Sequence, residues 1–439
     1  MVASISRQFE TGAEPVEPHD MSGDTSIATP YGILDTQAHF IRDVPSVSIL
    51  NEGEPSHTAR PNDQVFVHDM RAVQVNPQFA EEIETCRRKI SNIHYEGAGF
   101  MEEAVCFTPD GYFELKTARS KGKFLWVSGG SGRLAQALDP NGRHFDTKMD
   151  IMHNPEQVSG RGIIFMGVGR ASNYYHWMGE QMPRLALLRK HTDLSSIDNI
   201  VVFVKEPVSF IPASVKALFP EFKGNIQQVK GHSTHLDEAF FFVPHPLASR
   251  SESGDEIPKP AGRLRASWGS LLDFSHHFDT QADRLIAPKG DSPDVVVVSR
   301  EKAPMRKWLN EQALLDRLEG ADARKILSED LDFTSQINVF HHARVVIAQH
   351  GAGLANILFC KPGTRVIEVT GRSHARRSWD FVKLALARGL EYHVVVIDAE
   401  LDAPYDAVEE PEERIPSLYA SDLSASDEAL TRISELALD

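Results

Sequence analysis

A turn containing two glycines follows a short apolar run in the C-terminal third of the chain. Residues 345–348 (VVIA) are apolar and mostly β-branched, which predicts a buried strand. The run ends at Gln349-His350-Gly351-Ala352-Gly353, and an apolar helical pattern continues to Phe359. Backbone N–H groups and the positive end of a helix dipole favour an anion at such a junction. The sequence therefore predicts an anion-binding turn at 350–353, with a tight turn that only packs closely as the alternative.

A cation-rich segment follows a second apolar run. Residues 294–299 (DVVVVS) predict another buried strand. The next eight residues contain four cations, Arg300, Lys302, Arg306 and Lys307. The planar guanidinium of arginine can bind phosphate oxygens in pairs. Because open α/β sheets bind ligands at the carboxyl ends of their strands, this segment and His350 are expected at one crevice. The pattern favours a diphosphate-binding loop, and a solvated charged loop is the alternative.

A histidine and a glutamate occur four residues apart within the segment 173–184 (NYYHWMGEQMPR). His176 and Glu180 would share one face of a helix, which Asn173 can cap. A histidine and a glutamate that point into a cleft can supply a general base. The alternative is an aromatic-rich helix that packs on its sheet and buries His176. Pro183 predicts a break or kink, because proline does not fit a helix interior.

Two other patterns carry less weight. Residues 130–135 (GSGRLA) fit a GxGxxA dinucleotide-binding turn, but no strand ending in an acidic residue follows at the required distance. Asp330 and Asp332 resemble a metal-binding DxD pair, yet they directly precede a helical pattern, whose N-terminus favours acids. The three cysteines are far apart and predict neither a zinc site nor a disulfide framework: Cys86, Cys106 and Cys360. We therefore expect reduced thiols and no bound metal.

The elements that must position these residues alternate between strands and helices from residue 162 onward. Strands are predicted at 163–168, 200–204, 239–243, 294–299, 345–348, 365–369 and 392–397. Helices are predicted at 174–188, 212–218, 264–278, 310–318, 333–342, 354–359, 379–387 and 424–438. This alternation predicts an α/β fold whose sheets are mainly parallel and carry helices on both faces.

The 439 residues exceed one ordinary domain, so we expect two. Residues 1–60 are polar and predict an irregular or disordered N-terminal arm. An N-terminal α/β domain is placed at 61–285. A C-terminal Rossmann-like domain with its C-terminal helix is placed at 286–439. A loop rich in proline, serine and glycine at 244–262 interrupts the first of them.

The amino-acid composition limits the classes of protein to which the chain can belong. Hydrophobic residues make up 41% and charged residues 25%, which is typical of a soluble globular protein. The net charge of −16 argues against a general nucleic-acid binder, which needs a basic surface. No secretory signal or membrane-spanning run is visible, so a cytoplasmic protein is expected, with attachment to the inner face of a membrane through a surface patch or a partner left open.

Three segments, taken together in this order and spacing, resemble glycosyltransferase family 61. They are 173–185 (NYYHWMGEQMPRL), 299–311 (SREKAPMRKWLNE), and 335–359 (SQINVFHHARVVIAQHGAGLANILF) with 363–369 (GTRVIEV). The resemblance covers about 103–398. It implies a GT-B-like fold, in which two Rossmann-like domains face each other across a cleft, with the acceptor on the N-terminal side and the nucleotide-sugar on the C-terminal side.

The resemblance also implies roles for individual residues. The residues expected to bind the donor are Arg300, Arg306, Asn310, His350, Gly351, Ala352, Gly353 and Glu368. The two arginines and the asparagine are expected near the diphosphate, the four turn residues approach the donor, and Glu368 is a candidate for the ribose hydroxyls. His176 and Glu180 match the motif of the N-terminal domain, where His176 is the expected base and Glu180 orients or replaces it.

The implied activity is that of an inverting glycosyltransferase, which moves a sugar from a nucleotide-sugar, by analogy a UDP-sugar, to a hydroxyl of a glycan acceptor. Arginines and helix amides can neutralise the leaving diphosphate, so transfer without a metal or other cofactor is expected. The lack of a membrane anchor and of secretory cysteines favours a bacterial, cytosolic role in capsule or other polysaccharide synthesis.

Two other functions remain open at this level. One is an NAD(P)-dependent oxidoreductase or sugar-nucleotide epimerase that uses the turn at Gly130 and Gly132. The other is a scaffold protein that binds a sugar-nucleotide without turning it over. No pattern specifies the donor sugar, the acceptor or the oligomeric state.

Overall fold

The computed structural model describes residues 33–34, 47–49, 65–69, 107–108, 111–112, 114–127, 156–165, 171–204, 206–230, 233–245, 268–371, 379–399 and 422–439. The chain divides into two compact units. The first unit comprises Met1–Ser56 and Tyr112–Ser270, and the second comprises His57–Gly111 and Leu271–Asp439. Most of the predicted N-terminal arm, the turn at 130–135 and most of the 244–262 loop lie outside the described residues, and the predicted domain boundaries stay predictions.

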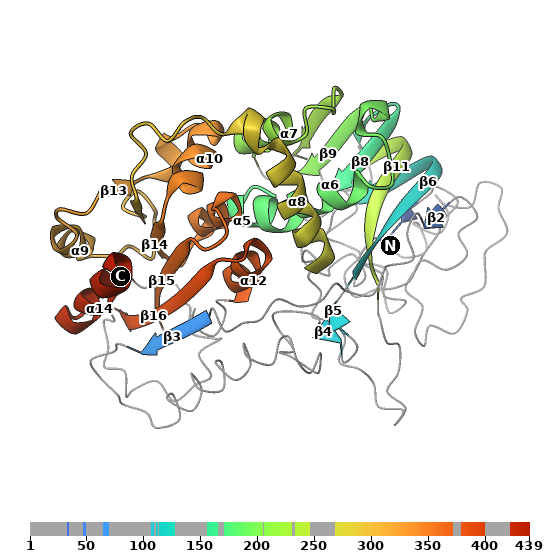
Figure 1. The fold of residues 1–439 in the computed structure, drawn as a ribbon. Coiled ribbons are helices and arrows are strands. Elements are labelled where there is room, and N and C mark those ends of the chain that lie inside the picture. The colour runs from blue at the N-terminus through green and yellow to red at the C-terminus, as the bar shows by residue number, and fades with distance from the viewer. Residues whose placement is uncertain are drawn as a thin grey trace, which may run out of the picture. The chain divides into compact units, whose positions relative to one another are not determined.

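The first unit contains a mixed sheet (Figure 1). Its parallel strands are β8 (Arg161–Phe165), β9 (Asn199–Phe203) and β10 (Asn225–Val229). β11 (Ser233–His245) pairs in parallel with β8 and antiparallel with β6 (Glu114–Val127). The short strands β1 (Ile33–Leu34) and β2 (Val47–Ile49) pair with β6, and β7 (Glu156–Gln157) pairs with β11. Its helices are α5 (Tyr174–His176), η2 (Trp177–Gln181), α6 (Met182–Leu188), η3 (Leu194–Ser196) and α7 (Phe210–Leu218).

The second unit contains a parallel sheet in the order β13-β12-β14-β15-β16. These strands are β12 (Val295–Val298), β13 (Ala323–Ile326), β14 (Val345–Gln349), β15 (Arg365–Gly371) and β16 (Glu391–Ala399). β3 (Val65–Asp69) extends the sheet in parallel beyond β16, and β17 (Leu423–Ser424) pairs antiparallel with the end of β16. The strands β4 (Phe107–Thr108) and β5 (Gly111–Tyr112) form a separate two-stranded sheet.

Helices cover both faces of this second sheet. The described helices of this part of the chain are α8 (Trp268–Leu285), which begins in the first unit, α9 (Glu311–Arg317), η4 (Ser328–Asp330), α10 (Phe333–His342), η5 (Ala352–Phe359), α12 (Trp379–Arg388) and α14 (Asp427–Leu438). α9 and α14 pack on one face, and α10, η5 and α12 pack together on the other. The α/β fold with parallel sheets is therefore confirmed. No helix among the described residues is long and apolar enough to cross a membrane.

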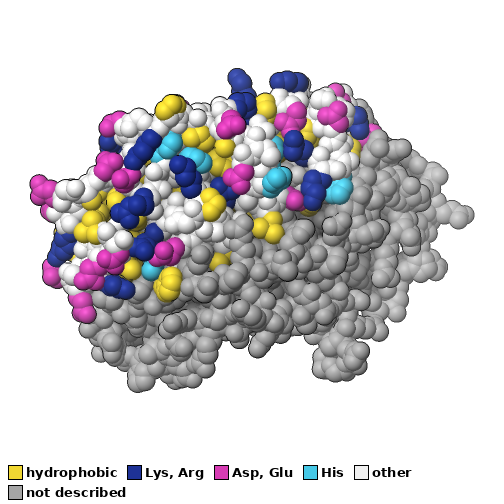
Figure 2. Space-filling view, viewed as in Figure 1, with side chains coloured by type: hydrophobic (Ala, Val, Ile, Leu, Met, Phe, Trp, Pro, Cys, Tyr) yellow, Lys and Arg dark blue, Asp and Glu magenta, His cyan; other side chains and the backbone are white. Residues whose placement is uncertain are grey.

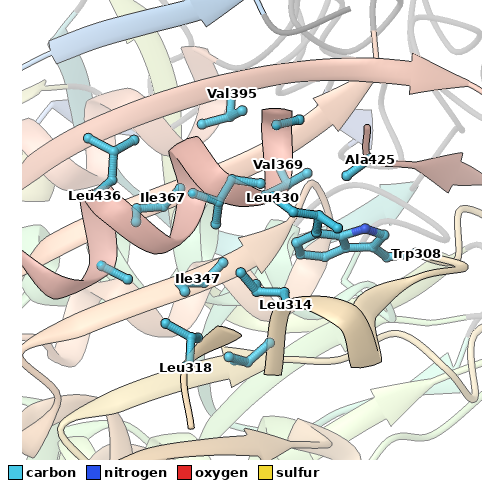
Figure 3. Close-up of a cluster of buried hydrophobic side chains, with 14 of the residues drawn as sticks. Trp308, Leu314, Leu318, Ile347, Ile367, Val369, Val395, Ala425, Leu430 and Leu436 are labelled. Atoms are coloured by element: carbon cyan, nitrogen blue, oxygen red, sulfur yellow. The ribbon is translucent and has the colours of Figure 1, made fainter. Parts of the chain in front are cut away.

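One apolar cluster fixes α9 and α14 to the sheet (Figure 3). Val345 and Ile347 of β14 contribute to it, as do Ile367 and Val369 of β15. Side chains alternate between the two faces of a strand, so Glu368, which lies between the last two, points to the opposite face. That face carries η5 and α12.

We expect Leu436→Ala to lower the free energy of unfolding of the second unit by about 2–5 kcal/mol, because it removes a buried side chain and leaves a cavity. Leu436 is 5% exposed in the cluster (Figure 3). Leu438, two residues along the same helix, is 52% exposed. Leu438→Ala is therefore the matched control and should change stability by no more than about 0.5 kcal/mol. Urea unfolding of both variants measures the difference, and equal midpoints would show that α14 does not complete the core.

Candidate functional site

The strand order of the second unit creates a topological switch point between β12 and β14. The chain leaves β12 and forms β13 on one side, then returns to form β14 on the other side of β12. In open parallel sheets ligands bind where the strand order reverses in this way, outside the carboxyl ends of the two strands. Those ends carry Ser299 and Arg300 after β12, and His350 and Gly351 after β14.

Arg300 lies directly against the glycine turn. A Cβ added at Gly351 would overlap Nη1 of Arg300 and lie 3.0 Å from its Cζ. The guanidinium also donates from Nε to the carbonyl of Arg306 at 3.2 Å and from Nη2 to that of Met305 at 3.3 Å. These bonds hold the arginine over the turn. Gly351 is needed for this close approach rather than for its backbone angles, because its φ of 173° is ordinary extended backbone.

The other predicted residues of the cation-rich segment have different surroundings. Lys302 pairs with both carboxylate oxygens of Asp330 at 2.6 Å, which raises its pKa. Arg306 adopts a left-handed backbone with φ of 57°, an uncommon conformation for a residue other than glycine. The amide of Asn310 accepts hydrogen bonds from Trp308 Nε1 at 2.9 Å and Ala425 N at 3.0 Å. It also donates to Ala425 O at 2.7 Å, so Asn310 ties the start of α9 to the C-terminal segment. Its contact with a donor stays a prediction.

The turn at 350–353 leads into η5, which is a 3-10 helix rather than the α-helix that the pattern alone suggests. The first hydrogen bond of this helix runs from Leu354 N to Gly351 O at 3.0 Å. Among the described residues, the amides of Gly351, Ala352 and Gly353 make no backbone hydrogen bond outside the regular elements. Gly353 packs against β12, since an added Cβ would lie 3.2 Å from Val298 Cγ1. The turn therefore places backbone amides next to Arg300.

Three side chains form a buried hydrogen-bonded chain behind the turn. Nδ1 of His350 pairs with Oε1 of Glu368, and the hydroxyl of Tyr392 donates to Oε2 of the same carboxylate at 2.8 Å. The side chain of His350 is 13% exposed, whereas Glu368 is 0% exposed. Burial, together with the carboxylate, raises the pKa of Tyr392 well above its usual value, so the phenol stays a donor. Because both oxygens of Glu368 are engaged, contact with a ribose would require one of these bonds to open, and that role stays a prediction.

The first unit holds the second predicted cluster on a helix that changes type. Asn173 caps α5 as expected, since its Oδ1 accepts from Tyr175 N at 3.0 Å and His176 N at 3.4 Å. The helix then widens to the π-helical turn η2 before α6 begins. Pro183 explains the change, because its ring would clash with the carbonyl four residues earlier and it has no N–H to donate. The predicted break is therefore a π-helical turn, a feature that occurs frequently at functional sites.

His176, Glu180 and Arg184 lie along one side of this helix. Nδ1 of His176 is 3.1 Å from Oε1 of Glu180, but the angle of this contact is not that of a hydrogen bond, and Nδ1 has no hydrogen-bond partner among the described residues. The His176 side chain is 27% exposed, while Glu180 is buried at 3%. Burial lowers the pKa of Arg184 to about 10, and the charge of Glu180 opposes that shift. Arg184 therefore stays protonated at neutral pH and supplies a positive charge next to the buried Glu180. If the ring aligned with Glu180, the proton of His176 would lie on Nδ1 and Nε2 would be left to accept a proton.

Two residues near the switch point were not singled out by the sequence. Tyr392 lies in an apolar strand and reads there as a core residue, so no signal marks it. The side-chain amide of Gln349, at the end of β14, is buried without a hydrogen-bond partner among the described residues. A polar residue that ends an apolar run is a weak signal that could have drawn attention to it.

The DxD pattern has a structural explanation. Oδ1 of Asp332 accepts from Ser335 N at 2.7 Å and caps α10, as its position before the helical pattern indicated. The described part of the chain holds no group of three or more histidine, cysteine, aspartate or glutamate side chains suited to a metal ion. On the face shown in Figure 2, basic and acidic side chains are interspersed rather than gathered by sign.

A doubly wound parallel sheet with an arginine over a glycine turn at its switch point is an arrangement typical of α/β proteins that bind nucleotides. A comparison with known proteins identifies a family that part of the chain matches. Residues 174–367 match the Glycosyltransferase 61 family. The match includes every predicted site residue except Glu368, which directly follows its end.

One characterised relative is similar over a shorter stretch. It is the EGF domain-specific O-linked N-acetylglucosamine transferase of Xenopus laevis, 27% identical over 129 residues. The aligned stretch covers 28% of this chain and 24% of the relative. The chain thus matches about a quarter of the length of that protein.

Proposed function

We propose that the chain is an inverting glycosyltransferase that moves a sugar from a nucleotide-sugar to a hydroxyl of a glycan acceptor. The observation that carries the proposal is the position of Arg300 over the Gly351 turn at the switch point of a family 61 segment. Breaking a sugar–phosphate bond leaves a diphosphate whose negative charge must be neutralised. A guanidinium and backbone amides at one place are suited to that task.

The donor in this proposal is a UDP-sugar bound by the second unit. Its diphosphate contacts Arg300 and the amides of the turn, with His350 beside them. Arg306 and Asn310 remain candidates for contacts to the same nucleotide. These groups supply positive charge and hydrogen-bond donors themselves, so we propose that transfer requires neither a metal ion nor another cofactor.

The acceptor in this proposal is a glycan hydroxyl bound by the first unit. His176 removes its proton through Nε2 while the oxygen attacks the anomeric carbon from the side opposite the leaving diphosphate. Glu180, held by the charge of Arg184, keeps the proton of His176 on Nδ1 and stabilises the imidazolium that forms. The reaction inverts the anomeric carbon and releases UDP. It requires the two units to face each other across a cleft, as in a GT-B enzyme.

Thermal-shift binding tests the donor, with UDP, GDP, CMP, NAD and NADP offered with and without Mg²⁺. We expect UDP to stabilise the protein without a metal, by about 2.7 kcal/mol at 100 times its dissociation constant. UDP release from a panel of UDP-sugars with oligosaccharide acceptors then tests turnover. Stabilisation by NAD or NADP alone would instead indicate a dehydrogenase or epimerase, and UDP binding without turnover of any UDP-sugar would indicate a binding scaffold.

A further inference from the structure

Behind the turn, the chain from Tyr392 through Glu368 to His350 connects three elements of the second unit. Tyr392 belongs to β16, Glu368 to β15, and His350 follows β14. Glu368 and Tyr392 are neighbouring-strand residues on the face that carries η5 and α12, and both side chains are 0% exposed. A polar pair enclosed in this way costs free energy unless its hydrogen bonds are made. The contacts described above satisfy both oxygens of the carboxylate.

The arrangement determines which nitrogen of His350 can act on a ligand. Glu368 engages Nδ1, so Nε2 is the nitrogen on the side of the ring away from the carboxylate. The ring is further held by Phe381 of α12, whose centroid lies 5.2 Å away at 76°. His350 directly precedes Gly351, over which the guanidinium of Arg300 lies. A proton on Nε2 would therefore be presented beside the same diphosphate that Arg300 is proposed to bind.

We propose that Tyr392 and Glu368 are positioning residues that hold His350 as a hydrogen-bond donor, through Nε2, to the diphosphate of the nucleotide donor. The inference rests on the proposed function and deepens it, because it adds a second cationic donor at the leaving group. Glu368 thus acts through His350 rather than on the ribose. Tyr392, which the sequence did not mark, keeps the carboxylate oriented toward Nδ1.

The charged and titratable groups around His350, in the part of the chain that is described, favour opposite protonation states. The carboxylate of Glu368 on β15 favours the imidazolium, which is the form with a proton on both nitrogens. Arg300 on the segment after β12 opposes it, and bound diphosphate again favours it. Tyr392 on β16 stays neutral, and the ring of Phe381 on α12, which contacts His350, carries no charge. UDP affinity should therefore fall as the pH rises and His350 loses its second proton.

Calorimetry of UDP binding between pH 5.5 and 9 tests the inference on the full chain. Tyr392→Phe keeps the ring and removes only the donor, and we expect it to weaken UDP binding by about 3–10-fold, the worth of one hydrogen bond. Glu368→Gln removes the negative charge, so the loss of UDP affinity should occur about 1 pH unit lower than in the wild type. Thr364→Val is the matched control. It deletes a buried hydroxyl that donates to Ala343 O at 3.2 Å. Thr364 directly precedes the first residue of β15, at the end of the strand away from His350, so UDP affinity should be unchanged.

The outcomes separate this inference from the function on which it rests. Wild-type protein that fails to bind UDP at any pH would overturn both. If the wild type binds UDP and both Tyr392→Phe and Glu368→Gln bind it with the same affinity and pH dependence, the inference alone would be overturned. If Glu368→Gln fails to fold, Tyr392→Phe still tests the inference, because replacing a purely structural tyrosine would change the melting temperature and leave UDP affinity unchanged.

Discussion

Replacement of Arg300 by alanine is expected to lower kcat/KM for a UDP-sugar by about 10²–10³-fold, the effect of removing one donor to a developing negative charge. Arg300 is the cation that the structure holds over the turn at the switch point. UDP binding should weaken by about 10–100-fold, the value of a charge-assisted hydrogen bond. Arg300→Lys should recover little, because an ammonium cannot reproduce a paired contact with phosphate oxygens. Initial rates and calorimetry measure both effects.

Two further variants make this result specific. Arg324→Ala removes an arginine of the same unit that pairs with Asp291 at 3.2 Å, and it should change neither rate nor affinity. Gly351→Ala displaces the guanidinium by introducing a Cβ where Nη1 lies. Combined with Arg300→Ala it should add almost no further loss, because the two changes disrupt one interaction. If the losses of the two variants were additive, or if kcat/KM of the Arg300→Ala enzyme stayed within about twofold of wild type, Arg300 would not be part of the donor site.

Replacement of His176 by alanine is expected to lower kcat by about 10²–10⁴-fold, the usual contribution of a general base. UDP affinity should stay within about twofold, because the proposed donor site lies in the other unit. The rise of rate with pH that reports deprotonation of the base should disappear as well. Glu180→Gln should lower kcat at least about 10-fold, since an amide in that position favours the wrong tautomer of the histidine. Steady-state rates over a pH series measure these effects.

A second histidine serves as the control for this result. His342 of α10 contacts the carbonyl of Ala287 at 2.8 Å in the second unit, and His342→Gln should leave kcat and its pH dependence unchanged. Near-normal turnover of the His176→Ala enzyme would contradict the assignment and leave Glu180 as the remaining candidate for the base. A parallel loss of UDP affinity would show instead that His176 contributes to donor binding.

Periodicity predicted the apolar elements of the fold well. The runs at 294–299 and 345–348 became β12 and β14, and the patterns at 310–318 and 333–342 became α9 and α10. β10 and β13 were missed, since NIQQV and ARKI lie at the edge of their sheets and carry polar side chains. The pattern also could not distinguish the 3-10 helix η5 from an α-helix. The two helix types have similar numbers of residues per turn, and eight residues are too few to separate their periods.

The candidate residues themselves were recognisable without coordinates, because chemistry depends on residue type and on local spacing. Arg300 after one apolar run, His350 with its glycines after another, and His176 four residues before Glu180 are all local patterns. A strand end, a helix start and a shared helix face are properties of neighbouring residues, so the sequence by itself determined them. The segments that resemble family 61 are also local sequence patterns, and the match to that family agrees with them.

Contacts between residues distant in the chain were decided only by the tertiary structure. Strand order places β12 beside β14 and so puts Arg300 over Gly351, 51 residues later. The register of β15 and β16 brings Tyr392 to Glu368, and the turn after β14 brings His350 to the same carboxylate. Local propensity contains no information on register or strand order, which follow from how the apolar faces of whole elements pack together. The sequence therefore determined which groups are present, and packing determined which of them act on one another.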